Sequence, residues 1–231
     1  SETVSGRILN PNENALPLVA IQLDNAIVRG EATLIQMDYA AALQLVWNNG
    51  LLAISGRMID TFGARRRPTL VASPIQLSLS NVTAEIPLGL LRMRLGGQGI
   101  FPVPIERQAD RCVFLVDEGQ PHIEIIGVES LATERPYVKL RGEDNAYVGA
   151  PTLSDPMLYV SDLQGNTSVN IMDDLRSESL AWIDERRPSW SVRWSKLRSR
   201  SQIYHRLTPE NYRQDGAIYF GFQEFDLPPL P

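Results

Sequence analysis

The feature that most constrains the fold is a short strand pattern that recurs along the first two thirds of the chain. In each copy, apolar and polar residues alternate, an Asn follows, and a second short strand comes after it. The three clearest copies are Ile21–Val28, Leu43–Leu52 and Ile75–Thr83. Alternation with a period of two is typical of a β-strand that buries one face. Because bends and not helices separate the copies, the repeat predicts a solenoid.

An Asn or Asp marks the same place in every copy. The marker positions are Asn25, Asn49, Asn81, Asp110 and Asn145, the last two in weaker copies, at intervals of 24 to 35 residues. One turn of a β-solenoid takes roughly 20–30 residues and tolerates insertions at its bends. An Asn at the same corner of successive coils donates to one neighbour and accepts from the other, which satisfies a buried amide. We therefore predict a structural ladder of Asn25, Asn49, Asn81 and Asn145.

The predicted fold class is all-β, a single-stranded right-handed parallel β-helix of the pectin-lyase-like kind. The alternative is a β-sandwich with Asn in its turns, where Asn is common. In the first three copies the Asn shares the parity of the apolar residues and so lies on the apolar face of the strand. This parity favours the β-helix, because a turn residue of a sandwich has no reason to follow it.

The chain divides into three parts. Residues 1–17 are polar and contain an Asn-Pro-Asn-Glu-Asn run, which predicts an N-terminal arm or linker. Residues 18–169 carry the strand copies and are expected to form the solenoid. Residues 170–231 are expected to form a short helix over 171–187, which Pro188 ends, and then an extended tail. Because an open solenoid end exposes strand edges, we expect residues 170–231 to cap the same domain.

Composition and motifs exclude several functional classes. Hydrophobic residues make up 43% of the 231 positions, too much for a disordered chain, and no apolar run approaches the roughly 18 residues of a membrane span. The net charge of −5 gives no reason to expect nucleic acid as a partner. The single Cys112 excludes an intrachain disulfide and is expected to be a buried structural thiol. The nucleophile elbow, Walker A, His-Glu-x-x-His and EF-hand patterns are absent, and no cofactor or metal is expected.

Acidic residues are the candidates for catalysis, because β-helix enzymes that act on polysaccharides use two or three carboxylates on neighbouring coils. The candidate carboxylates are Asp24, Asp60, Glu85, Asp110, Asp117 and Glu118. His122 with Glu124 is a further candidate for acid–base work if both lie on one strand face. Ordinary surface carboxylates and a surface histidine at a bend are the simpler interpretation. Carboxylates that converge in one groove favour an enzyme, and dispersed ones favour a binding protein.

Positive charge concentrates in the tail. Residues 186–206 hold seven Lys and Arg and no Asp or Glu, interleaved with aromatic residues. Two interpretations are open: the strip contacts an external anion, or it lays its arginine stems along the acidic solenoid wall, which is the simpler one. We further expect aromatic residues of the tail to anchor it, namely Trp190, Trp194, Tyr204 and Tyr212. The candidate anion contacts are Arg193, Lys196, Arg198 and Arg200.

Several phrases in a fixed order carry a family resemblance. They are Ile27–Leu34, Trp47–Ser55, Asn81–Ala84, Asn145–Tyr147, Trp194, His205–Tyr212 and Leu227–Pro231. In this order they resemble the region C-terminal to the kinase domain in a set of planctomycete serine/threonine protein kinases. The resemblance covers residues 18–231, and no single phrase in it is specific.

The resemblance implies a larger protein with an ATP-using kinase domain upstream, often followed by a membrane-spanning helix. The chain itself lacks the Gly-rich loop, the His-Arg-Asp loop and the Asp-Phe-Gly motif, so no kinase catalytic residue is carried over. We expect a non-catalytic sensor or scaffold module that binds a glycan or a protein, on the extracytoplasmic side of a membrane-anchored kinase. The alternative is a polysaccharide-active enzyme, a lyase or a glycoside hydrolase, on the same fold.

Overall fold

The computed structural model describes most of the solenoid and parts of the C-terminal region. The described ranges are 18–66, 74–96, 99–131, 138–148, 157–170, 183–186, 192–195, 203–215, 220–223 and 227–228. The arm predicted over residues 1–17 lies outside them. Within these ranges, no helix has the length and apolar character needed to cross a membrane.

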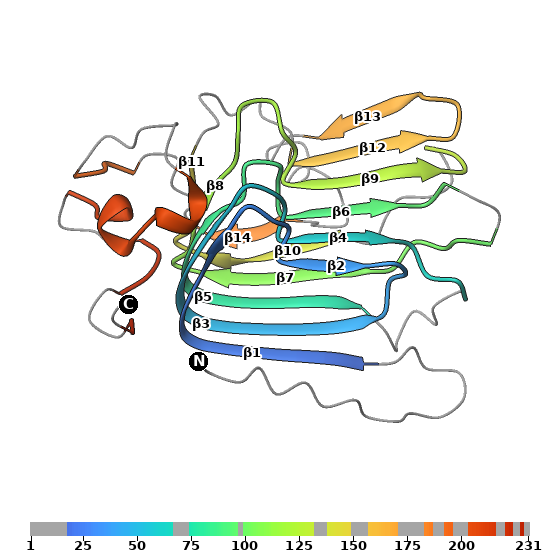
Figure 1. Cartoon of the computed structure of the whole chain (residues 1–231). Coiled ribbons are helices and arrows are strands. Elements are labelled where there is room, and N and C mark those ends of the chain that lie inside the picture. The colour runs from blue at the N-terminus through green and yellow to red at the C-terminus, as the bar shows by residue number, and fades with distance from the viewer. Residues whose placement is uncertain are drawn as a thin grey trace.

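Two sheets form the walls of a right-handed parallel β-helix, as predicted (Figure 1). Sheet A contains β1 (Leu18–Gly30), β3 (Ala42–Ile54), β5 (Ile75–Glu85), β7 (Ile105–Asp110), β10 (Val138–Glu143) and β14 (Ile183–Arg186), with β8 (Val113–Leu115) and β11 (Ala146–Val148) beside them. Sheet B contains β2 (Ile35–Met37), β4 (Ile59–Phe62), β6 (Leu91–Arg94), β9 (Ile123–Val128), β12 (Leu158–Asp162) and β13 (Thr167–Asn170). The chain visits the two sheets in turn, so each strand pairs in parallel with the strand one coil away. Only the β12–β13 pair is antiparallel among the described strands.

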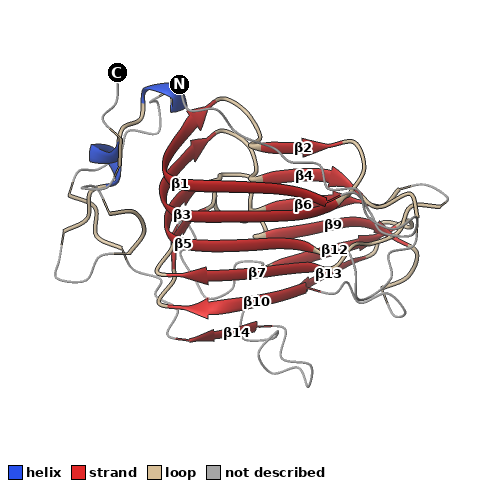
Figure 2. Cartoon of the chain, turned by 90° about the horizontal axis from the view of Figure 1, so that it is seen from below, coloured by secondary structure: helices blue, strands red, loops and turns tan. Residues whose placement is uncertain are grey.

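The hydrophobic core lies between the two sheets, which Figure 2 shows as two layers of strands. Along β3, Leu43, Leu45 and Trp47 are buried while the residues between them face outward. Ile59 and Thr61 of β4 are buried from the opposite side. Burial of one large apolar side chain contributes about 1.5–3 kcal/mol, so the alternating pattern itself determines which face turns inward.

The first three strands of sheet A bend at an Asn in the left-handed region, with φ of 51° at Asn25, 53° at Asn49 and 53° at Asn81. Asn adopts this region at lower cost than most residues, because its short polar side chain hydrogen-bonds locally. Arg111 (φ 54°) and Asp144 (φ 55°) take the equivalent position in the next two coils. We call these five residues the corner row. In Figure 1 the strands turn upward at this row.

Two neighbouring Asn side chains of the corner row are joined by a direct hydrogen bond. Asn49 Nδ2 donates to Asn25 Oδ1 at 2.9 Å, but Asn81 Nδ2 donates to Ser80 Oγ at 3.3 Å. Asn145, predicted as a ladder residue, lies one position past the corner. Its buried amide instead donates to the Ala109 carbonyl oxygen at 2.7 Å and accepts from a backbone N–H at 2.9 Å. The predicted ladder is therefore wrong at Asn145, and it is also wrong for Asn81, which does not bond to Asn49. Strand register, and not residue type, determines which residue occupies the corner.

A short C-terminal segment, residues 220–223, crosses the coils beside the corner row, and we call it the strap. The strap donates three backbone N–H bonds, from Gly221 to the Arg111 carbonyl at 2.6 Å, from Phe222 to Thr83 Oγ1 at 3.3 Å, and from Gln223 to Asn49 Oδ1 at 2.6 Å. Asn49 Nδ2 also donates back to the Gln223 carbonyl at 3.2 Å. The strap therefore occupies Asn49 Oδ1, the acceptor that Asn81 would need in a continuous Asn ladder.

Asn49→Ala is expected to lower the free energy of unfolding by about 2–4 kcal/mol, and Asn49→Gly by about 1–3 kcal/mol. Both changes delete the carboxamide that bonds to Asn25 and Gln223, but only Ala is strained at a positive φ. Chemical denaturation of the two variants separates these contributions. Equal losses for Ala and Gly would show that the left-handed conformation at this corner has no cost.

The tail packs on the outer face of the strand segments that follow the corner. The 3₁₀ helices η1 (Tyr204–Arg206) and η2 (Pro209–Tyr212) bring Leu207 and Tyr212 onto Leu51 and Ala53 of β3, with Trp194 beside them. The Tyr212 hydroxyl donates to the buried Glu85 carboxylate. Trp194, Tyr204 and Tyr212 thus contact the solenoid as expected, whereas Trp190 lies outside the described residues.

The helix predicted over residues 171–187 is wrong at its end, where Ile183–Arg186 form β14. This segment pairs in parallel with β10, from Leu140↔Ile183 to Glu143↔Arg186. The free N–H and C=O groups at the edge of β10 favour a strand partner over a helix. Residues 171–182 lie outside the described part of the chain.

Candidate ligand-binding surfaces

The candidate catalytic carboxylates are dispersed over the molecule. Asp24 and Asp110 occupy the same register row of sheet A but are three strands apart, with Asn48 and Ser80 between them. Asp24 accepts hydrogen bonds from Asn48 and Gln22, which lower its pKa. Asp117 and Glu118 follow β8 in a turn. Among the described residues, no two of these six carboxylates meet in one groove.

Two carboxylates on the outer face of sheet B are engaged by arginines. Asp60 accepts from Arg94 Nη2 at 2.6 Å and from Arg92 Nη2. Glu124, two strands away across β6, pairs with Arg57 Nη2 at 2.6 Å. Each of these two carboxylates is thus paired with at least one guanidinium, and they lie two strands apart.

His122 does not join Glu124. Its ring is 2% exposed in the interior, where it packs edge-on against Phe114 and Tyr147, with ring centroids 5.0 and 5.7 Å apart. The expected surface position is thus wrong, because His122 precedes β9 in a bend and turns into the solenoid. Burial, with the charge of Arg107, holds the pKa of His122 well below its usual value.

Cys112 is a buried thiol, as expected. Burial raises its pKa to about 12, which leaves it protonated and unreactive at neutral pH. In the part of the chain that the structure describes, His, Cys, Asp and Glu side chains form no group of three or more that would hold a metal ion.

The basic strip of the tail is described only in part. Arg193 is exposed, and its backbone carbonyl accepts from the Asp215 N–H at 2.8 Å. Lys196, Arg198 and Arg200 lie outside the described residues. Arg206, at the end of η1, is exposed, and neither Arg193 nor Arg206 forms a salt bridge with the described part of the wall.

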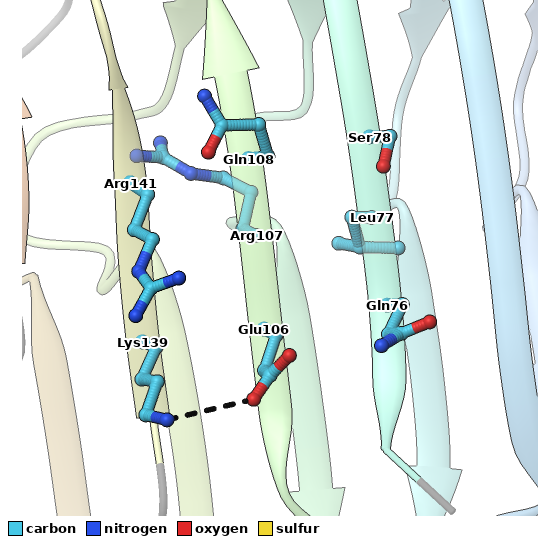
Figure 3. Close-up of a pocket in the computed structure, with 8 residues that line it drawn as sticks. All are labelled: Gln76, Leu77, Ser78, Glu106, Arg107, Gln108, Lys139 and Arg141. Carbon is cyan, nitrogen blue, oxygen red and sulfur yellow. Dashed lines mark ion pairs between the residues drawn. The ribbon is translucent and has the colours of Figure 1, made fainter.

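The outer face of sheet A carries a shallow hollow of about 120 Å³ (Figure 3). We call it the sheet A hollow. Its lining comes from β5, β7 and β10 and comprises Gln76, Leu77, Ser78, Glu106, Arg107, Gln108, Lys139 and Arg141. Leu77 and Arg107 are buried, so the polar side chains of the alternate positions form the accessible surface.

Strand register arranges these polar side chains in two rows across the strands. One row is Gln76, Glu106 and Lys139, and the other is Ser78, Gln108 and Arg141. Lys139 Nζ lies 3.7 Å from Glu106 Oε1, with both side chains about half exposed. Figure 3 shows Arg141 beside this pair on β10.

The two rows were missed at the sequence level although each strand shows them as polar residues two apart. The pairs are Gln76 and Ser78, Glu106 and Gln108, and Lys139 and Arg141. An alignment of the strand copies places these three pairs side by side. The surface consists mainly of amides, a hydroxyl and cations, so a search for acidic residues alone does not find it.

The fold supports many functions, so function has to be argued from these surfaces and not from the β-helix itself. Comparison of the chain with protein-family models, with curated proteins and with solved structures gives no match.

Proposed function

We propose that this chain is a non-catalytic ligand-binding module of a larger protein, and that its ligand is a saccharide. The observation that carries the proposal is the sheet A hollow, where six polar side chains from three neighbouring strands stand in register. They provide amides, a hydroxyl, a carboxylate and two cations. A saccharide offers many hydroxyl groups, each of which donates and accepts, and this mixed set of partners matches them.

The rigid wall supports binding at such a shallow surface. Neighbouring strands are about 4.7–4.9 Å apart, and the ladder hydrogen bonds hold the side-chain roots in place before a ligand arrives. Less ordering entropy is then lost on binding, which compensates for a small contact area. The volume of about 120 Å³ is below the roughly 300–1,000 Å³ of an enclosed small-molecule site, which favours surface binding.

The dispersed carboxylates support a binding role over the polysaccharide-active enzyme. The family resemblance supports placing the module in a serine/threonine kinase, with the kinase domain upstream and the solenoid as its extracytoplasmic sensor or scaffold. The isolated chain is expected to phosphorylate nothing, since it lacks the motifs that handle ATP.

The double change Gln108→Ala and Arg141→Ala is expected to weaken saccharide binding by at least about tenfold, because each side chain removed contacts the ligand directly. Titration calorimetry of the full chain against a panel of neutral oligosaccharides provides the measurement. The melting temperature should stay within about 2–3 °C, because Gln108 and Arg141 are exposed.

The matched control is Gln164→Ala with Arg206→Ala, which removes the same two functional groups from exposed positions outside sheet A. It should bind like the wild type. The proposal is wrong if no oligosaccharide binds at millimolar concentration, or if the control loses as much affinity as the hollow variant. Release of shortened or unsaturated products would instead establish the enzyme.

A further inference from the structure

A continuous line of contacts runs along the outer face of sheet B and its adjoining loops. The Cζ atom of Arg65 lies 3.8 Å from the ring centroid of Tyr39. The ring of Tyr39 lies 6.4 Å from that of Phe62, and Arg94 Cζ lies 4.6 Å above Phe62. Arg94 in turn shares the Asp60 carboxylate with its neighbour on β6. We call this line the basic–aromatic array, and its members are Arg65, Tyr39, Phe62, Arg94, Asp60 and Arg92.

The array exposes two aromatic rings, one on a strand of sheet B and one on an adjoining loop. Tyr39 is 39% exposed and Phe62 36%, whereas the other aromatic side chains in the described ranges are buried, as Trp47 and Phe114 are, or partly buried. The rings come from successive coils, Phe62 from the end of β4 and Tyr39 from the loop after β2. Adjacent exposed rings that a backbone scaffold holds in place are typical of a binding surface.

The array is also positive in a protein whose net charge is −5. It contains three guanidiniums and one carboxylate. Asp60 is 10% exposed at its side chain and lies below Arg92 and Arg94, which are 30% and 34% exposed. The carboxylate therefore orients the two guanidiniums and leaves part of each open to solvent. Glu124 lies beside Arg92 on the next strand and also pairs with Arg57, so with both included four guanidiniums still outnumber two carboxylates.

We propose that the basic–aromatic array binds an acidic saccharide, a sugar polymer that carries carboxylate or sulfate groups. The aromatic faces of Tyr39 and Phe62 pack against the C–H faces of sugar rings, and the guanidiniums pair with the acidic groups. A neutral sugar would leave the cations unused, and an acidic peptide would leave the rings without matching faces. The array lies on sheet B and the hollow on sheet A, in the two layers of Figure 2, so the two sites succeed or fail separately.

Affinity electrophoresis of the full chain through gels that contain a defined polymer tests the proposal. The probes are alginate for carboxylated sugars, dextran sulfate for sulfated sugars, dextran as the neutral sugar, and polyglutamate as an acid without sugar rings. We expect alginate or dextran sulfate to retard the protein, with retardation that falls as salt rises from about 50 to 500 mM. The stronger of the two probes identifies the acidic group, and dextran and polyglutamate should retard the protein much less.

Three variants locate the site. Tyr39→Ala with Phe62→Ala keeps every charge and is expected to weaken binding of the acidic sugar by about tenfold or more. Arg65→Ala keeps both rings and is expected to weaken it several-fold. Arg206→Ala removes another exposed cation, from the tail, and should change nothing.

Several outcomes would overturn the proposal. They are the absence of retardation by both acidic sugars, retardation by polyglutamate as strong as theirs, and normal binding by the Tyr39→Ala, Phe62→Ala variant. Loss of binding in Arg206→Ala would also overturn it, because the tail would then be the site. Circular dichroism and thermal melting of each variant confirm that the fold is intact before binding is compared.

Discussion

Glu185→Ala is expected to lower the free energy of unfolding by about 3–5 kcal/mol, the largest effect of any single change considered for this chain. Glu185 of β14 is buried, and its carboxylate accepts from Arg107 Nη2 at 2.9 Å, Asn145 Nδ2 at 2.6 Å and the Tyr147 hydroxyl at 2.7 Å. Arg107 is itself 1% exposed. Burial alone would lower the pKa of Arg107, but Glu185 and Tyr147 reverse this and raise it. Deletion of the carboxylate therefore leaves an uncompensated cation in the core.

Denaturation of the wild type and of Glu185→Ala in guanidinium chloride gives the difference in the free energy of unfolding directly. The matched test repeats the change in an Arg107→Leu background. Arg107 lies in a register row with Leu77 and Leu140, so Leu restores an apolar row and removes the buried cation. In this background Glu185→Ala should lower the free energy of unfolding by clearly less. Equal losses in both backgrounds would show that Arg107 does not depend on Glu185.

Stability is expected to fall in acid because of His122. Burial and the nearby Arg107 cation depress the pKa of His122 in the folded protein, so the folded state binds no proton there when the unfolded state already does. This difference in proton binding adds to the free energy of unfolding, and the full contribution is present above the pKa of His in the unfolded chain, about 6.5. As the pH falls below that pKa, the contribution is lost by up to about 1.4 kcal/mol per pH unit. Between pH 7 and pH 5 the loss attributable to His122 has an upper limit of about 2 kcal/mol, reached when the folded pKa lies below this range.

His122→Phe should abolish this part of the pH dependence, because a neutral ring keeps the edge-on packing against Phe114 and Tyr147. The measurement is the difference in unfolding free energy between wild type and variant at pH 7, 6 and 5. His205→Gln is the control, since His205 is exposed and its Nδ1 lies 3.1 Å from Glu31 Oε2 at the surface. Parallel pH curves for wild type and His122→Phe would contradict the argument.

The fold was predictable where one local pattern is repeated. The errors lie at positions whose structure depends on pairing with neighbouring coils. Alternation around Asn25, Asn49 and Asn81 was sufficient to predict the β-helix, because burial of one strand face is a local property. Arg111 and Asp144 occupy the corner only because β7 stacks in register on β5, and β10 on β7. Residue type alone pointed instead to positions one residue away.

The candidate surfaces were harder to predict for the same reason. Tyr39, Phe62 and Arg94 come from three different coils, and no spacing along the chain shows that their side chains touch. The strand character of Ile183–Arg186 likewise depends on the free edge of β10 and not on the segment's own sequence. Long-range register determines both, whereas periodicity reports only local structure.

The strap changes how the solenoid is expected to come apart. A stack in which each coil contacts only its neighbours can lose coils one at a time from an end. Residues 220–223 bond to Asn49, Thr83 and Arg111, which belong to three successive coils, and so link the first of these coils to the third, which do not pair directly. Loss of any one of these coils then removes contacts from the other two. The strap thus converts a chain of separable units into a single cooperative one, in which the C-terminal segment of the protein governs the stability of strands near its beginning.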